Sequence, residues 1–266
     1  CMIVFMGWYV NRFWKEFDKF RYSLILWLLV ALQAGLILKI SSNLSSCLIL
    51  MLMVFILTFI VGKHPKMHLI IAAVGIVMIV IFIMWLKANM PLDSEMDKYP
   101  YQIRRFFGWL DPERYAGTLG YQPLQSLYAI GSGGLLGKGL GNGTQKLSNI
   151  PEAQNDMIFA IICEELGLIG VIIMFLMFGY LLYQMVIVVK ESRNIYASVV
   201  VIGVILHIIF QIIVNVCVAV NFFPNTGVSL PFISAGGSAI ICTLMEIGLV
   251  IGIRRQQVNR KYSRIS

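Results

Sequence analysis

Apolar stretches long enough to cross a lipid bilayer are the feature that most limits what this chain can fold into. A membrane-spanning helix needs about 17–25 mostly apolar residues, and residues 69–90 form one such stretch. Inside a bilayer every backbone polar group must find its partner within the protein, which leaves helices and closed barrels as spanning structures. Only 13% of the residues are charged, against roughly 25% in soluble domains. The sequence therefore predicts an all-α, polytopic transmembrane helical bundle.

About seven spans are expected, within a single membrane domain covering residues 1–266. The predicted spans are residues 1–10 (in part), 23–38, 47–62, 69–90, 157–189, 197–220 and 237–253. If each predicted span crosses the membrane once, the connections that contain the basic residues all lie on the same side. An excess of lysine and arginine marks the cytoplasmic side of a membrane protein. The tail 254–266 belongs to this basic set. The net charge of +8 is therefore interpreted as a cytoplasmic rim that meets anionic lipid, and no nucleic-acid partner is expected.

The sequence lacks the cysteine patterns of disulfide-rich or zinc-binding domains and the features of a signal peptide. Five cysteines lie in or beside apolar segments without CxxC or CxxH spacing, so neither a disulfide framework nor a zinc site is predicted. The first ten residues lack the basic start and the cleavage site of a signal peptide. Because the sequence begins with Cys1 inside an apolar stretch, we expect it to be part of a longer protein.

The longest connection, residues 91–156, is predicted to be a large extracytoplasmic loop. Its charge is nearly balanced, it is rich in glycine and aromatic residues, and connections of this length are usually functional. ATP is absent outside the cytoplasm, so no nucleotide cofactor is expected. The loop is therefore predicted to carry the functional site.

A glycine-rich run at residues 131–146 allows two interpretations. It departs from the phosphate-binding loop pattern because its Gly-Lys pair is followed by glycine instead of Ser or Thr. The run is either a tightly turning loop or a site where backbone amides, Lys138 and Lys146 hold an anionic headgroup. Arg104 and Arg105 are candidates to join them, since arginine suits phosphate recognition, although adjacent arginines are often only solvated charge.

Asp156 ends the loop and precedes the predicted span 157–189. One interpretation is helix capping, by Asn155 or Asp156. The other is a general base at the outer membrane surface. The positive end of the helix dipole stabilises a carboxylate, and an ionised carboxylate accepts a proton that leaves late in a reaction.

Polar residues recur at a similar depth in three predicted spans. The span 157–189 is about 50 Å long at 1.5 Å per residue, so it has to tilt or protrude from a hydrocarbon core of about 30 Å. Such residues are either a functional intramembrane site or interhelical hydrogen bonds. The predicted intramembrane polar layer consists of Glu164, Glu165, His207, Gln211, Asn215 and Glu246.

Residues 221–236 contain too many prolines and glycines for a continuous helix. The segment is nevertheless apolar enough to enter the membrane, where irregular backbone has to be buried in protein or line a cavity. A re-entrant segment beside the outer cavity is therefore predicted.

Four motifs in order along the chain resemble the SEDS family of bacterial cell-wall proteins, which includes FtsW, RodA and SpoVE. The motifs are Tyr121-Gln-Pro-Leu-Gln-Ser126, Gly137-Lys-Gly-Leu-Gly-Asn-Gly-Thr-Gln-Lys146, Pro151-Glu-Ala-Gln-Asn-Asp-Met-Ile-Phe-Ala160 with Glu164-Glu-Leu-Gly167, and Pro224-Asn-Thr-Gly-Val-Ser-Leu-Pro-Phe-Ile-Ser-Ala-Gly-Gly-Ser238. The resemblance implies the last seven of ten transmembrane helices, in a bacterial cytoplasmic (inner) membrane, with an active site that faces outside.

The resemblance also implies a function, the polymerisation of peptidoglycan glycan strands from lipid II in division, elongation or sporulation. Asp156 occupies the position of the essential acid in the family's E-x-x-T-D-F motif, which implies that it deprotonates the acceptor sugar hydroxyl. The residues expected to bind substrate are Arg104, Arg105, Lys138, Lys146, Gln122, Gln145, Glu152 and Ser234. A divalent metal (Mg or Mn) is left open as a cofactor.

The expected partners are lipid II, a class B penicillin-binding protein and other divisome or elongasome membrane proteins. Two alternatives to the polymerase stay open at this point. A lipid II flippase would depend on Glu164, Glu165 and Glu246, and a non-catalytic scaffold would depend on none of these acids.

Overall fold

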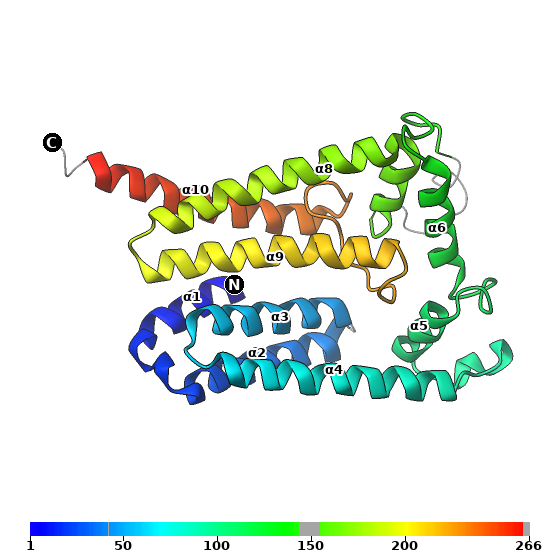
Figure 1. Ribbon diagram of the computed structural model, residues 1–266, viewed down its shortest axis with the longest axis horizontal. Helices are drawn as coiled ribbons and strands as arrows, with labels where there is room; N and C mark the ends of the chain where they lie inside the picture. The colour runs from blue at the N-terminus through cyan, green and yellow to red at the C-terminus, as the bar shows by residue number, and fades with distance from the viewer. Residues whose placement is uncertain (42, 144–154, 263–266) are drawn as a thin grey trace. The chain divides into compact units, whose positions relative to one another are not determined.

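The computed structural model describes residues 1–41, 43–143 and 155–262 of the chain (Figure 1). Its regular elements in these ranges are all helical, which confirms the predicted all-α class. The chain divides into two compact units, residues 1–65, 175–211 and 236–266 in unit 1, and residues 66–174 and 212–235 in unit 2. The prediction of a single membrane domain stays a prediction.

Six helices are long and apolar enough to cross a membrane, so the chain is a multi-pass membrane protein. They are α2 (Phe20–Ser41), α3 (Leu44–Val61), α4 (Pro65–Ala88), α8 (Ile158–Glu191), α9 (Ile195–Ala219) and α10 (Gly237–Tyr262). Each contains one of the predicted spans or overlaps it closely. The first predicted span, residues 1–10 in part, corresponds to α1 (Met2–Arg12), which has 11 residues.

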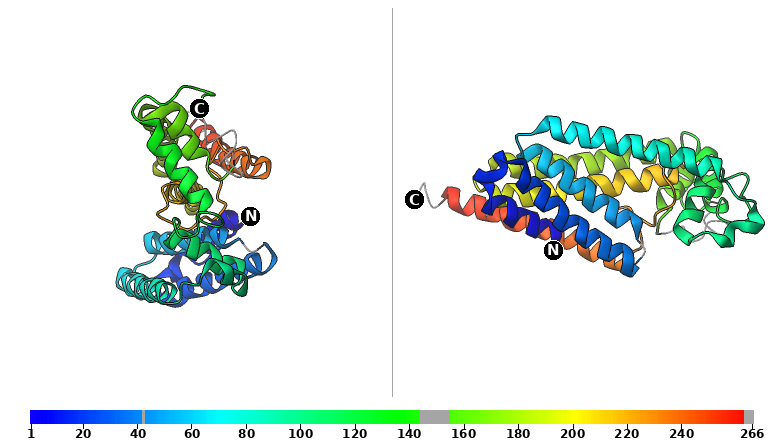
Figure 2. Two further views of the ribbon diagram at one scale, coloured as in Figure 1. Left: turned by 90° about the vertical axis from the view of Figure 1, so that its right-hand side faces the viewer. Right: turned by 90° about the horizontal axis from the view of Figure 1, so that it is seen from below.

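Unit 1 contains the antiparallel pair α2 and α3, which lie side by side (Figure 2). Apolar residues fill their contact, and Trp27 Nε1 donates a hydrogen bond of 2.8 Å to Thr58 Oγ1 across it. In the same unit, α10 continues past the predicted end at residue 253 to Tyr262. The hydropathy of the sequence ends there, but arginine, lysine and glutamine are good helix formers, so the helix itself continues.

Unit 2 contains the segment predicted as a loop, and the described part of this segment is largely folded. It holds the short 3₁₀ helix η2 (Asp93–Lys98), α5 (Tyr101–Leu110) and α6 (Tyr121–Gly133). Leu86, Met96, Phe107 and Tyr115 form a core in which no side chain is more than 6% exposed. Tyr115 donates its hydroxyl hydrogen bond to the Pro91 carbonyl over 2.7 Å. The segment is therefore a scaffold that can hold side chains in fixed positions.

α8 differs from the predicted continuous span because it is broken at Gly167, where φ is 63° and ψ is −164°. The ribbon of α8 changes direction near its N-terminal end (Figure 1). Residues 168–191 alone extend about 36 Å, close to the hydrocarbon thickness of about 30 Å. The strong tilt or protrusion predicted for the whole stretch is thus unnecessary, and Glu164 and Glu165 lie before the break instead of deep in a straight helix.

Candidate active site

The connector between α9 and α10, residues 220–236, forms one wall of the candidate site. It is not helical, as the prolines and glycines predicted, and Asn221, Gly227 and Phe232 have positive φ angles. Irregular backbone leaves N–H and C=O groups that need partners outside the segment itself. Several of these partners are side chains that the sequence had singled out. Its predicted depth in the membrane stays a prediction.

Asp156 lies against this connector. A methyl group placed on Gly227 would lie 3.4 Å from Oδ2 of Asp156, so the carboxylate and the Gly227 backbone are neighbours. The side chain is half-buried. α8 begins two residues later, at Ile158, and helix ends are defined only to within one or two residues. Capping and catalysis both stay open as roles for this carboxylate.

Two buried side chains hold the backbone at residues 155 and 156. Asn215, on α9, donates from Nδ2 to the carbonyls of Asp156 (2.9 Å) and Val228 (2.7 Å). Ser234 donates its hydroxyl to the Asn155 carbonyl over 2.7 Å. The side chains of Asn215 and Ser234 are 0% and 2% exposed. They therefore fasten the chain that carries the Asp156 carboxylate to the connector.

Arg105, on α5, reaches the same connector from another direction. Its Nη1 donates to the Asn225 carbonyl over 3.4 Å, and its Nη2 donates to the Tyr101 hydroxyl over 2.8 Å. The guanidinium also lies 4.5 Å from the centre of the Tyr101 ring, a distance at which a cation is attracted to an aromatic face. These contacts fix the orientation of the guanidinium without neutralising it.

A cleft of about 140 Å³ adjoins Arg105. Its walls are formed by Tyr101, Arg105, Thr118, Leu119, Tyr121, Gln122, Pro123 and Asn225. Asn225 donates from Nδ2 to Gln122 Oε1 over 2.5 Å, while its own Oδ1 is buried and has no hydrogen-bond partner among the described residues. A buried acceptor of this kind costs free energy unless something donates to it. The cleft thus presents a cation to a polar ligand, and a buried acceptor that needs a donor lies in the side chain of Asn225 in its wall.

Arg105 and Asp156 contact the connector at positions that are two residues apart. Arg105 contacts the carbonyl of Asn225 and Asp156 adjoins Gly227, and two residues of chain span at most about 7 Å. A carboxylate that can accept a proton and a cation that can stabilise developing negative charge therefore lie along one short stretch of backbone.

The other predicted cations are placed differently. Arg104 pairs with Asp97 over 2.6 Å, and Lys138 pairs with Glu164 over 2.8 Å. Arg105 forms no ion pair with any carboxylate in the described parts of the chain. Among the remaining predicted residues, Lys146, Gln145 and Glu152 lie outside the described residues. Of the predicted substrate-binding cations that the structure describes, Arg104 and Lys138 are paired with carboxylates, which leaves the charge of Arg105 most available to a ligand.

The glycine loop, residues 134–141, is fastened to the break in α8. The amides of Lys138 and Gly139 donate to the carbonyls of Glu164 and Glu165 over 2.9 and 3.0 Å. In return, the amides of Leu168 and Ile169 donate to the carbonyls of Gly134 and Leu135. A helix break leaves such groups without intrahelical partners, and the loop supplies them. The amides of Lys138 and Gly139 are thus engaged by α8, which favours the interpretation of the run as a tightly turning loop; the headgroup site stays a prediction.

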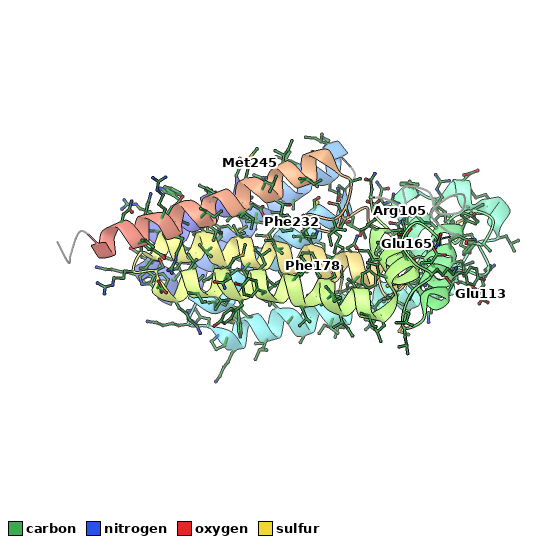
Figure 3. All side chains as sticks on the ribbon, turned by 90° about the horizontal axis from the view of Figure 1, so that it is seen from above. Arg105, Glu113, Glu165, Phe178, Phe232 and Met245 are labelled. Atoms are coloured by element: carbon green, nitrogen blue, oxygen red, sulfur yellow. The ribbon has the colours of Figure 1, made fainter. Side chains whose placement is uncertain are left out.

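The predicted polar layer is distributed over separate contacts. In unit 1, His207 Nδ1 lies 2.8 Å from Glu246 Oε1, which is the interhelical contact that one interpretation predicted. Gln211 follows one turn later on the face of α9 that carries His207. Unit 2 contains the other members of the layer, Glu164, Glu165 and Asn215. Glu165 of α8 and Arg105 of α5 are labelled in Figure 3. The geometry gives Asn215 a contact with the candidate site that the sequence did not predict.

The Lys138–Glu164 pair leads to a stability prediction. The Glu164 side chain is 0% exposed and that of Lys138 is 32% exposed, so losing the ammonium removes a counter-charge from a buried carboxylate, whereas losing the carboxylate leaves a partly hydrated cation. We expect Lys138→Met to destabilise the protein by about 1–3 kcal/mol and Glu164→Gln by less. The double variant should recover most of the loss. Thermal unfolding in detergent measures this, and an unchanged midpoint with lost activity would instead assign Lys138 to substrate.

Asn215 leads to a second prediction. Asn215→Ala removes the donor to two carbonyls and loosens the chain at Asp156. We expect kcat to fall about 10- to 100-fold with little change in KM, because the cleft around Arg105 is left intact. Ile213→Ala, at an exposed position of the same helix, is the control and should retain full activity. Equal effects on kcat and KM would contradict a positioning role.

The divalent metal left open by the sequence stays a prediction. In residues 1–41, 43–143 and 155–262, no group of three or more His, Cys, Asp or Glu side chains is arranged to hold a metal ion. Because the described residues do not assemble a donor set, no chemical step is derived through a metal.

Comparison with known proteins places these features in a family. Residues 1–259 match the FtsW/RodA/SpoVE family, described as cell cycle proteins. Stage V sporulation protein E of Bacillus subtilis (strain 168) is 31% identical over 255 residues, covering 96% of this chain and 66% of that protein. A probable peptidoglycan glycosyltransferase FtsW of Saccharophagus degradans is 33% identical over 264 residues, covering 98% of this chain and 65% of that protein.

Solved structures show the same fold. A peptidoglycan synthase complex that coordinates polymerization and crosslinking has a TM-score of 0.65 at 26% identity, covering 90% of this chain and 62% of that chain. A variant of the rod shape determining protein RodA from Thermus thermophilus has a TM-score of 0.56 at 22% identity, covering 92% of this chain and 62% of that chain. The chain thus spans about two thirds or less of the length of these relatives.

Proposed function

Because the chain belongs to the FtsW/RodA/SpoVE family of cell cycle proteins, we propose that it carries the active site of a peptidoglycan glycan-strand polymerase. The substrate is lipid II, and the reaction transfers the growing glycan from its undecaprenyl diphosphate carrier to a sugar hydroxyl of the next lipid II. Curated relatives named probable peptidoglycan glycosyltransferase FtsW support this assignment.

In the proposed reaction, the Asp156 carboxylate accepts the proton of the acceptor hydroxyl as its oxygen bonds to the anomeric carbon of the donor sugar. The bond between that carbon and the diphosphate oxygen breaks, and the electron pair leaves with undecaprenyl diphosphate. A diphosphate leaves as a stable anion and needs no general acid, but its developing charge needs a cation. Stabilisation of such charge is usually the largest catalytic contribution.

One observation carries the proposal: the carboxylate of Asp156 and the guanidinium of Arg105 both lie against the connector, residues 220–236. Asp156 adjoins Gly227, and Arg105 contacts the Asn225 carbonyl with its charge unpaired by any described carboxylate. Arg105 is therefore proposed to hold the diphosphate, and Gln122 and Asn225 in the adjoining cleft to hold polar groups of the substrate. Arg104, whose partner Asp97 has a 96% exposed side chain, can exchange that partner for phosphate at little cost.

The site is proposed to face outside the bacterial cytoplasmic membrane, with the basic tail inside, following the charge bias of the connections. The proposed partner is a class B penicillin-binding protein. The structural similarity to a chain of a peptidoglycan synthase complex that couples polymerization to crosslinking supports this partner. Other divisome or elongasome proteins stay predictions.

The test is a reconstitution of the full-length protein with its partner transpeptidase and lipid II. We expect glycan polymer that grows with time, whereas a flippase would move lipid II across liposomes without polymer and a scaffold would do neither. The partner transpeptidase with lipid II but without this chain is the control, and it should form no polymer. Transport alone, or polymer only when another glycosyltransferase is added, would contradict the proposal.

A further inference from the structure

Three leucines of the glycine loop are held outward on a stretch of backbone that is well anchored. The side chains of Leu135, Leu136 and Leu140 leave the residues 68%, 77% and 76% exposed. A loop in water normally exposes polar residues, and contiguous exposed apolar groups mark a surface that something else covers. The surface therefore needs an occupant.

The position of the loop along α8 indicates what that occupant is. The amides of Leu168 and Ile169 donate to the carbonyls of Gly134 and Leu135 over 3.1 and 3.3 Å, so the loop lies directly beside residues 168–169. From Glu191 to Leu168 the helix rises about 35 Å, roughly the thickness of the hydrocarbon core. With the charged end of α8 at Lys190 and Glu191 placed at one edge of the hydrocarbon, Leu168 is expected at the other edge, and the loop at the same level.

Exposed apolar residues also occupy the part of α8 to which the loop is hydrogen-bonded. Leu168, Ile169 and Ile172 are 50%, 49% and 50% exposed, as expected for side chains that meet acyl chains. Exposed apolar residues on the spanning helix and on the loop bonded to it favour lipid as the shared partner of both.

The backbone and charge of the loop are compatible with lipid contact. The amides of Gly137, Lys138 and Gly139 have carbonyl partners, and backbone polar groups have to be paired before they can enter a bilayer. The one charged side chain of the loop, Lys138, is paired with the buried Glu164. The remaining residues of 134–141 are glycine and leucine. The cost of moving this loop out of water is therefore small.

From these observations we propose that the glycine loop inserts Leu135, Leu136 and Leu140 into the leaflet that surrounds the Leu168 end of α8. The loop then acts as an interfacial anchor that lies in the headgroup and upper acyl region, the depth typical of apolar faces that rest on a membrane. It fixes the height of the segment before the break, and so of Asp156, relative to the lipid. The insertion itself does not depend on glycosyltransferase activity.

The experiment attaches an environment-sensitive nitrobenzoxadiazole fluorophore to Leu136→Cys in the full-length protein, with the other accessible cysteines replaced, in liposomes of phosphatidylethanolamine and phosphatidylglycerol. Lipids with a nitroxide near the top of the acyl chain report contact with lipid, and iodide reports contact with water. We expect blue-shifted emission, several-fold stronger quenching by the nitroxide lipid than at a water-exposed site, and protection from iodide. Leu140→Cys should behave in the same way.

Two matched positions calibrate the result. Leu176→Cys, on the spanning part of α8 and 68% exposed, reports full lipid contact. Glu113→Cys, on the exposed turn after α5 (Figure 3), reports water. If the loop positions match Glu113→Cys, with iodide quenching and no nitroxide quenching, the anchor does not exist. Protection from both quenchers, in the protein alone or only after the transpeptidase is added, would show that protein covers the leucines and would equally overturn the proposal.

Discussion

Replacing Asp156 with alanine is expected to lower the rate of glycan synthesis by about 10²–10⁴-fold, the usual contribution of a positioned general base. The carboxylate is half-buried, adjoins Gly227 and is carried by backbone that Asn215 and Ser234 fasten. Asp156→Asn keeps the volume and removes the basicity, so it should lose activity to a similar extent. The measurement is polymer formed per folded molecule, from lipid II, by the full-length protein with its partner.

A control separates catalysis from helix capping. Glu113→Ala removes an exposed carboxylate of the same unit and should leave the rate unchanged. If Asp156 only caps α8, Asp156→Ala should lower the unfolding midpoint, while the activity of each folded molecule persists and Asp156→Asn, which retains a capping oxygen, behaves nearly as the wild type. Persistent polymer synthesis in both variants would remove the catalytic assignment.

The sequence predicts those features of this fold that depend on composition along the chain. Hydropathy and length locate the spanning helices, because a bilayer imposes nearly the same requirement on every span. Proline and glycine between residues 221 and 236 predict the irregular connector, since they break helices whatever surrounds them. Asp156 was singled out at the junction of loop and span, and the structure places it beside that connector.

Contacts between distant segments are what the sequence could not predict. The sequence around Lys138 predicts a cation in a polar loop that is available to substrate. In the structure Lys138 pairs with Glu164, which lies 26 positions later. The sequence predicts Asn215 as one member of a polar helix face. In the structure its side-chain amide donates a hydrogen bond to the carbonyl of Asp156, 59 positions earlier. No local pattern encodes such a partner. The charge pattern offered four equal cations for the diphosphate, and only tertiary contacts distinguish Arg105 from Arg104 and Lys138.

The break in α8 is the clearest case, and it yields the prediction with the largest effect on folding. Gly167→Ala is expected to destabilise the protein by roughly 3 kcal/mol or more. At φ 63° and ψ −164° the backbone occupies a region that is essentially restricted to glycine. A methyl group there would also overlap the amide nitrogen of Gly137 and lie 2.6 Å from the Leu135 carbonyl oxygen. Both are backbone atoms held by hydrogen bonds, because the Gly137 amide donates to the Gly133 carbonyl and the Leu135 carbonyl accepts from the Ile169 amide of α8, so neither moves aside at little cost.

Gly179, twelve positions along the same helix, provides the matched control. A methyl group at Gly179 has no atom within 4 Å, and alanine is a better helix former than glycine by up to about 1 kcal/mol, so Gly179→Ala should be neutral or slightly stabilising. The yield of monodisperse protein and its thermal unfolding midpoint in detergent compare the two variants. Equal behaviour would mean that α8 runs through residue 167 without a break, because in a continuous helix the two glycines would be equivalent. The connection between the glycine loop and Asp156 would then lose its physical basis, since it is the break that leaves the carbonyls of Glu164 and Glu165 open to the loop.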